Sequence, residues 1–163
     1  MTMSKVVTCL WYDGTAEEAA RLYTSLVPDS KIRQVHHAAA DNPSSRKGDV
    51  ITVDLTVGGH DIIALNGGPE FKHSEAASLS VLCEDQAEVD RLWTSLILGG
   101  GEPSVCGWLK DKFGVSWQIV PKILPELLDG PDREGAERAM KAMLGMTKLD
   151  VERLREAYEG VPA

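Results

Sequence analysis

Residues 108–121 show the clearest alternation of apolar and polar positions in the chain. They predict a β-hairpin, because a turn ending in glycine at residues 111–114 precedes a β-rich run and then a proline. Successive side chains of a strand point to opposite faces, so one face is wholly apolar: Val115, Trp117 and Ile119. Gln118 lies mid-strand on the other face, where burial without a hydrogen bond is costly. We therefore predict that Gln118 faces a cavity or water, and it is the first candidate site residue.

The first 66 residues predict a strand, a helix and three further strands. Residues 6–12 read as a strand, and Thr15 to Glu18 resemble a capping box that opens an amphipathic helix ending before Pro28. Three more β-rich runs follow at residues 31–40, 49–57 and 60–66. The helix is expected to pack on the sheet that these strands form.

The same order of elements restarts at residue 76. A strand at residues 76–84 leads to Asp85 as a helix cap, and an apolar helical face then runs to three glycines at residues 99–101. A shift of 70 places Thr15 on Asp85 and Glu18 on Glu88. We interpret the two halves as an internal repeat, which the strands at residues 105–112 and 115–120 complete.

The tail beyond Pro121 has a helical pattern. Asp132 is a plausible cap for a helix that ends at Leu144, and a second helix is expected at residues 149–158. Methionines at positions 140 and 143 lie on the apolar face of the first of these helices. Such a stripe indicates core or dimer packing rather than a ligand surface.

Composition narrows the class of protein. A chain of 163 residues with 43% hydrophobic residues can form one domain or two small modules sharing a sheet. A net charge of −8 argues against nucleic acid and anionic membranes as partners. No apolar run reaches the roughly 18 residues of a membrane span, and residues 1–5 lead into a strand without a signal-peptide core, so a cytoplasmic protein is expected. The three cysteines, Cys9, Cys83 and Cys106, have no metal or redox spacing and are expected to be buried free thiols.

Three stretches, residues 10–20, 64–71 and 111–121, closely resemble the vicinal oxygen chelate superfamily, and more narrowly its PhnB-like branch, often labelled 3-demethylubiquinone-9 3-methyltransferase-like. The tail resembles the helical ending of that branch, so the resemblance covers nearly the whole chain. It implies an α+β fold of paired βαβββ modules forming a half-open barrel, with helices on the convex side, and a homodimer. The expected division is residues 1–67, 68–121 and 122–163, within one structural domain.

The resemblance also suggests where a metal would lie. Metal-using members bind a divalent ion through four strand positions, which map here to Thr8, Ala64, Ser78 and Gln118, with Asn66 next along the same face. Neutral hydroxyl, amide and methyl groups are poor ligands for such ions. We therefore predict no metal centre and no cofactor. An alignment error of one residue would bring in Val7, Ile63 or Leu79, which are not ligands either.

The four histidines are the alternative source of chemistry. His36 and His37 are adjacent in a strand, so one faces the cavity side and the other does not, and either assignment is open. His60 and His73 are expected at the surface. A cavity histidine would be able to act as an acid or base, although a satisfied or exposed histidine is the commoner case.

The expected function follows from these residues. A metal-free homodimer that binds a small organic molecule is the first hypothesis, and an enzyme acting on a small oxygenated or quinone-like substrate is the alternative. A purely structural dimer is the third. Methyl transfer is not supported, because no glycine-rich turn joins a strand to a helix as an adenosyl-type donor needs. Trp11 is expected in the core. The predicted ligand-binding residues are Thr8, Tyr12, Ala64, Asn66, Phe71, Ser78 and Gln118.

Overall fold

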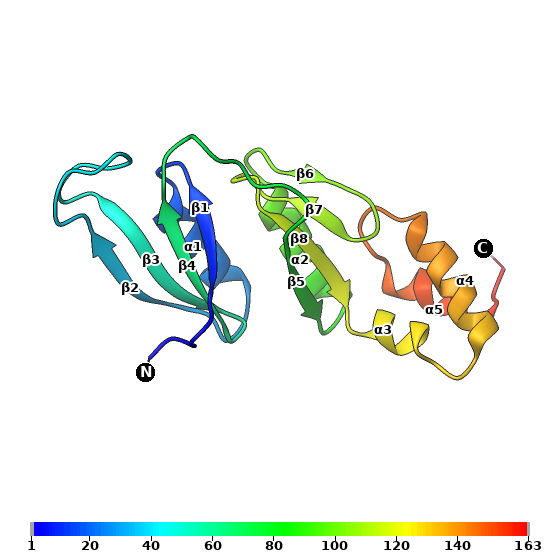
Figure 1. Cartoon of the computed structure of the whole chain (residues 1–163). Coiled ribbons are helices and arrows are strands. Elements are labelled where there is room, and N and C mark those ends of the chain that lie inside the picture. Colours follow the sequence, from blue (N-terminus) through cyan, green and yellow to red (C-terminus); the bar gives the residue numbers. More distant parts are fainter. Residues whose placement is uncertain (1, 163) are drawn as a thin grey trace. The chain divides into compact units, whose positions relative to one another are not determined.

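The computed structural model describes residues 2–162 and contains two four-stranded sheets with their helices (Figure 1). The first sheet and its helix comprise β1 (Thr8–Tyr12), α1 (Ala16–Leu26), β2 (Lys31–His37), β3 (Val50–Val57) and β4 (His60–Asn66). The second comprise β5 (Ser78–Cys83), α2 (Gln86–Ile97), β6 (Glu102–Pro103), β7 (Trp108–Lys110) and β8 (Ser116–Pro121). The tail forms α3 (Ile123–Leu128), α4 (Arg133–Leu144) and α5 (Val151–Glu159).

The two sheets have the same topology. The strand orders are β1-β4-β3-β2 and β5-β8-β7-β6, and in each the first and last strands of the module pair in parallel while the other pairs are antiparallel. The α+β fold of paired βαβββ modules is therefore confirmed. The chain forms two compact units, one ending at His73 and the other starting at Ser74, and each is described here by itself.

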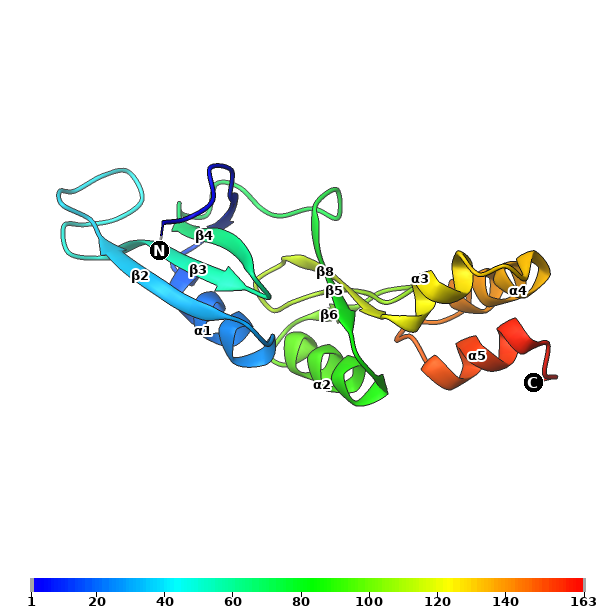
Figure 2. The ribbon, with the colours of Figure 1, turned by 90° about the horizontal axis from the view of Figure 1, so that it is seen from below.

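In the first unit, α1 packs on one face of the sheet (Figure 2). The side chains that point toward the helix are apolar and buried, among them Val53, Leu55 and Ile62. Tyr12 on β1 meets Tyr23 on α1, where the hydroxyl of Tyr12 donates to that of Tyr23 at 3.2 Å. The alternation along β3 and β4 thus separates a helix-covered face from an opposite one.

In the second unit, β8 has one buried apolar face, as its alternating sequence predicts. Val115, Trp117 and Ile119 are buried, and α2 lies on their side of the sheet. The indole of Trp117 donates to Oδ2 of Asp111 at 2.9 Å, while Oδ1 of Asp111 accepts the backbone N–H of Val115. The buried carboxylate of the hairpin turn is therefore fully bonded, as a buried charge requires.

Helix starts follow the predicted caps with one exception. Asp85 and Asp132 each accept a backbone N–H of the first helical turn at 2.9 Å, as expected. The predicted cap at Thr15 is wrong, because its side chain makes no capping bond. Instead, Oδ1 of Asn66, at the end of β4, accepts the N–H of Ala16 at 2.9 Å. A residue 50 positions away therefore caps α1.

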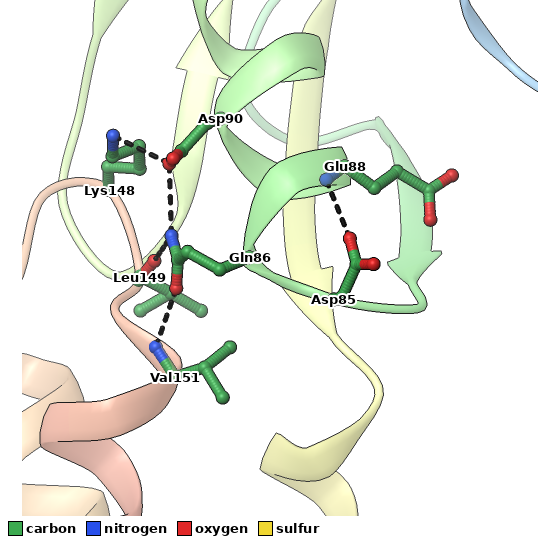
Figure 3. A network of polar contacts seen from close by, with 7 residues as sticks. All are labelled: Asp85, Gln86, Glu88, Asp90, Lys148, Leu149 and Val151. Carbon is green, nitrogen blue, oxygen red and sulfur yellow. Dashed lines mark hydrogen bonds and ion pairs between the residues drawn. The ribbon is translucent and has the colours of Figure 1, made fainter.

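The helical tail belongs to the second unit. Gln86 on α2 donates to the carbonyl of Leu149 at 3.1 Å and accepts the N–H of Val151 at 2.7 Å (Figure 3). Apolar side chains of α3, α5 and the segment between α4 and α5 form a separate cluster, consisting of Leu124, Met146, Leu149 and Leu154. In the predicted stripe, Met143 packs against this cluster and Met140 is exposed. The short helix α3 was not predicted. Within residues 2–162, no helix has the length and apolar character to cross a membrane.

Candidate functional site

The face of the second sheet opposite α2 carries a group of hydrogen-bonding side chains. Gln118 on β8 donates from Nε2 to Oγ of Ser78 on β5, at 3.0 Å. Trp108 on β7 is the cross-strand partner of Gln118, so its indole emerges on the same face. All three side chains are half-buried. A planar aromatic ring therefore lies beside an amide and a hydroxyl.

The hydroxyl of Ser116, on the same face, is buried without a hydrogen-bond partner among residues 2–162. Ser116 pairs with Ser78 and with Lys110 and is only 1% exposed. Lys110 forms an ion pair of 2.6 Å with Glu75, which lowers the pKa of Glu75 and raises that of Lys110. A buried hydroxyl without a partner costs about 1–3 kcal/mol, so a bound molecule that bonds to Ser116 would recover free energy.

The predicted site residues of the first sheet, Thr8, Tyr12, Ala64 and Asn66, all lie on the face that α1 covers. Tyr12, Ala64 and Asn66 are buried beneath α1, and Asn66 also donates from Nδ2 to the carbonyl of Val50 at 3.0 Å. Thr8 is half-buried at the start of β1, with its Oγ1 2.9 Å from Nε2 of His60. Of the seven, Ser78 and Gln118 are joined to each other by a hydrogen bond.

Phe71 belongs to a segment that folds back over β1. Its ring is 60% exposed and makes a T-shaped contact with Trp11 at 5.0 Å. The indole of Trp11 donates to the carbonyl of Gly68, and a Cβ on Gly67 would lie 2.3 Å from that indole. Trp11 was predicted in the core but is half-buried on the face opposite α1, because the returning segment covers it.

The register corrects the alignment of the two modules. Three residues connect β1 to α1, whereas two connect β5 to α2, so a shift of 70 that aligns the helix caps misaligns the strands by one residue. The counterpart of Ser78 is then Val7, not Thr8. Gln118 pairs with Ser80, and the matching pair in the first sheet is Ile63 with Cys9, so Ile63 replaces Ala64.

These positions do not fit the superfamily's divalent ion. Val7, Ile63, Ser78 and Gln118 supply no carboxylate, imidazole or thiolate ligand, which such an ion needs in place of its hydration shell. In the part of the chain that the structure describes, no three His, Cys, Asp or Glu side chains gather in a metal-binding arrangement.

The structure shows where His36 and His37, the adjacent pair in β2, each point. His36 points to the face opposite α1, where its Nε2 lies 3.0 Å from Oδ2 of Asp54. A β-bulge follows His36, and His37 turns outward and donates from Nδ1 to the carbonyl of Gly48 at 2.9 Å. His60 is exposed as predicted, whereas His73 is half-buried because its Nε2 donates to the carbonyl of Trp11.

Sequence reasoning did not select three residues of these faces: Ser116, Trp108 and Asp54. Ser116 lies two residues before Gln118 in the same strand, so the alternation of side chains already placed it on the candidate face. Nothing in the sequence indicated that Trp108 would lie beside Gln118 or Asp54 beside His36, because these contacts depend on the register between strands. Of the cysteines, Cys83 is buried as expected, but Cys9 is exposed.

The comparisons with known proteins point to one family. A model of the family described as 3-demethylubiquinone-9 3-methyltransferase matches residues 4–120. A Bacillus cereus PhnB protein, provisionally described by the same name, is 32% identical, covers 72% of this chain and 99% of its own, and superposes with a TM-score of 0.65. A Pseudomonas aeruginosa protein of known crystal structure shares the fold at 22% identity, with a TM-score of 0.52, over 70% of this chain and 94% of its own. No curated protein gave a match. The family match ends at residue 120, so the resemblance expected in the tail stays a prediction.

Proposed function

Because the chain belongs to the 3-demethylubiquinone-9 3-methyltransferase family, in the PhnB-like branch of the vicinal oxygen chelate superfamily, we propose that it binds a small organic molecule without a metal. The binding surface is the face of the second sheet opposite α2. One observation carries the proposal: the buried Oγ of Ser116 has no partner among residues 2–162, beside the hydrogen-bonded pair of Gln118 and Ser78.

The chemistry of this face defines the ligand. A primary amide both donates and accepts, and a serine hydroxyl does the same, so a carbonyl or hydroxyl oxygen fits either. The indole of Trp108 offers a flat apolar surface beside them. A neutral, planar molecule that carries a carbonyl or hydroxyl group therefore matches the face best.

Methyl transfer from an adenosyl-type donor is not part of this proposal. The connections from β1 to α1 and from β5 to α2 are Asp13-Gly14-Thr15 and Glu84-Asp85, which contain one glycine and none. A donor of that kind is usually held by a glycine-rich turn that allows close approach of the backbone.

Among the predicted ligand residues, the proposal rests on Ser78 and Gln118. We further propose that the protein is a homodimer, as members of the superfamily commonly are, and that it is cytoplasmic, which its unpaired thiols favour. Native mass spectrometry of the untagged chain, before and after incubation with zinc, nickel and manganese, tests the assembly and the metal together. A metal-free dimer supports the proposal, and one tightly held ion per subunit overturns its metal-free part.

Ligand binding is tested by calorimetric titration with 4-hydroxybenzamide, which is planar and neutral and carries both a hydroxyl and an amide. For a molecule of this size we expect a Kd of about 1 mM or below. Gln118→Leu is expected to weaken binding about tenfold, because the amide loses both its donor and its acceptor. Ser80→Ala, an exposed change on the same face, is the matched control. Equal affinity of wild type and Gln118→Leu would reject the site.

The pair of His36 and Asp54 favours a second function, acid–base catalysis at the face opposite α1. A carboxylate that holds one ring nitrogen orients the imidazole for proton transfer at the other. Deuterium exchange into hydroxyacetone, followed by NMR in deuterated water, measures this directly. Exchange that wild type accelerates and His36→Asn does not would support the enzyme, and the same rate for both would exclude it for this probe.

A further inference from the structure

The first unit contains a cavity separate from the candidate face of the second sheet; its lining includes Asp54, the partner of His36. Its volume is about 520 Å³, which lies in the range of small-molecule sites. Residues 2–3 and residues 31–34 of β2 line it together with Asp54 of β3. The cavity thus lies along the outer strand of the first sheet, beneath the segment that precedes β1.

Two irregularities of β2 determine which charges stand near this cavity. The register shifts between Ile32 and Gln34, so Arg33 is the extra residue of a β-bulge. Its guanidinium donates from Nη1 to Oδ1 of Asp61 at 3.1 Å, in a pair whose side chains are nearly buried. Bulges re-aim side chains and are common beside functional sites.

Asp61 is bonded from three directions. It accepts the N–H of Ser4 at 2.7 Å and the hydroxyl of Thr56 at 3.0 Å besides the guanidinium of Arg33. The bond from Ser4 also ties down the chain just after the two residues that cover the cavity. Arg33 is therefore held in one place by a fully bonded carboxylate.

The second bulge follows His36, the residue that bonds to Asp54, and Asp54 is the carboxylate that lines the cavity. His36 bonds to Oδ2 of Asp54, and this fixes the carboxylate while Oδ1 remains its other acceptor atom. Lys31, which is exposed, adds a positive charge on β2. The lining thus combines two cationic side chains on one strand with one carboxylate on the next.

We propose that this cavity is a second binding site, and that it takes a small zwitterion. The anionic group of the ligand would lie toward Lys31 and Arg33, and its ammonium group toward Asp54. A simple anion would meet repulsion from Asp54. A simple cation would meet repulsion from Lys31, since Asp61 offsets the charge of Arg33, so a ligand with both charges is matched best. This proposal does not depend on the function proposed for the second unit.

The test uses NMR titration of the untagged, isotope-labelled full chain with an ω-amino acid series: β-alanine, 4-aminobutyrate and 6-aminohexanoate. The series varies the separation of the two charges. We expect one member to shift the amides of residues 31–34 and 54, and propionate and propylamine to bind about tenfold more weakly, since each lacks one charge contact. The proposal is overturned if none of the three amino acids binds. It is also overturned if propionate and propylamine bind as tightly as the best amino acid.

Asp54→Asn provides the sharper result, because it removes the charge and keeps the shape. The variant is expected to lose about tenfold in affinity for the zwitterion while gaining affinity for propionate, whose repulsion it removes. Lys31→Met, at an exposed position that folding tolerates, is expected to weaken the zwitterion and propionate together. Lys47→Met, in the exposed loop of the same unit, is the control. Parallel loss of zwitterion and propionate affinity in Asp54→Asn would also overturn the proposal.

Discussion

Substitution of Asn66 by alanine is expected to unfold the first unit more easily. The side chain is 8% exposed and makes two hydrogen bonds to backbone: it accepts the N–H of Ala16 at 2.9 Å and donates to the carbonyl of Val50 at 3.0 Å. Alanine leaves both backbone groups without this partner, and each buried group left unsatisfied costs about 1–3 kcal/mol. The bond to Ala16 is buried, whereas the bond to Val50 is only partly buried, so we expect a total loss of about 2–4 kcal/mol.

The matched variant is Asn66→Asp. It keeps an oxygen for the N–H of Ala16, and a negative charge is favourable at the N-terminus of α1, but it loses the bond to Val50. We therefore expect a loss of about 1–2 kcal/mol. Urea denaturation followed by circular dichroism measures all three proteins. A free energy of unfolding for Asn66→Ala within about 0.5 kcal/mol of wild type would refute a structural role for this side chain. An equal loss in both variants would refute the capping argument.

Three further outcomes are expected. Gln86→Leu removes the bonds to Leu149 and Val151, so backbone amides of the tail should exchange hydrogen faster, whereas unchanged exchange would show that the apolar cluster alone holds the tail. The bonds to Asp61, led by the backbone N–H of Ser4, lower its pKa from 3.8 to about 2; the stability that they contribute is present above pH 4 and is lost as the pH falls toward 2. In Asp61→Asn, the urea concentration at the midpoint of unfolding should therefore fall less steeply as the pH is lowered below about 4. The same slope as in wild type would contradict the assignment to Asp61. Burial raises the pKa of Cys83 to about 12, so iodoacetamide at pH 8 should modify the exposed Cys9 first, as peptide mass spectrometry would show, and faster labelling of Cys83 would contradict its burial.

Local chemistry was sufficient to predict most elements of the fold. The alternation of residues 115–120 identified the buried face of β8, because a period of two can be satisfied by one strand alone. Aspartates at positions 85 and 132 are caps in the structure because a short carboxylate reaches the first helical turn of its own chain. The family resemblance lay in such local stretches, and the matched family confirms it.

The tertiary structure decided which residues meet. One extra residue between β1 and α1 places Thr8 and Tyr12 on the face that α1 covers, and their pairing with β4 places Ala64 and Asn66 on that face too. No local rule assigns the cap of α1 to a residue 50 positions away, or pairs His36 with Asp54.

The sequence by itself therefore determined the elements, the repeat and the family, since each depends on neighbours along the chain. Register, bulges and long-range hydrogen bonds depend on how strands align in space, and a slip of one residue reverses every side chain of a strand. For this reason the hydroxyl of Ser116 and the charged cavity beside β2 emerged as candidate sites only from the folded structure.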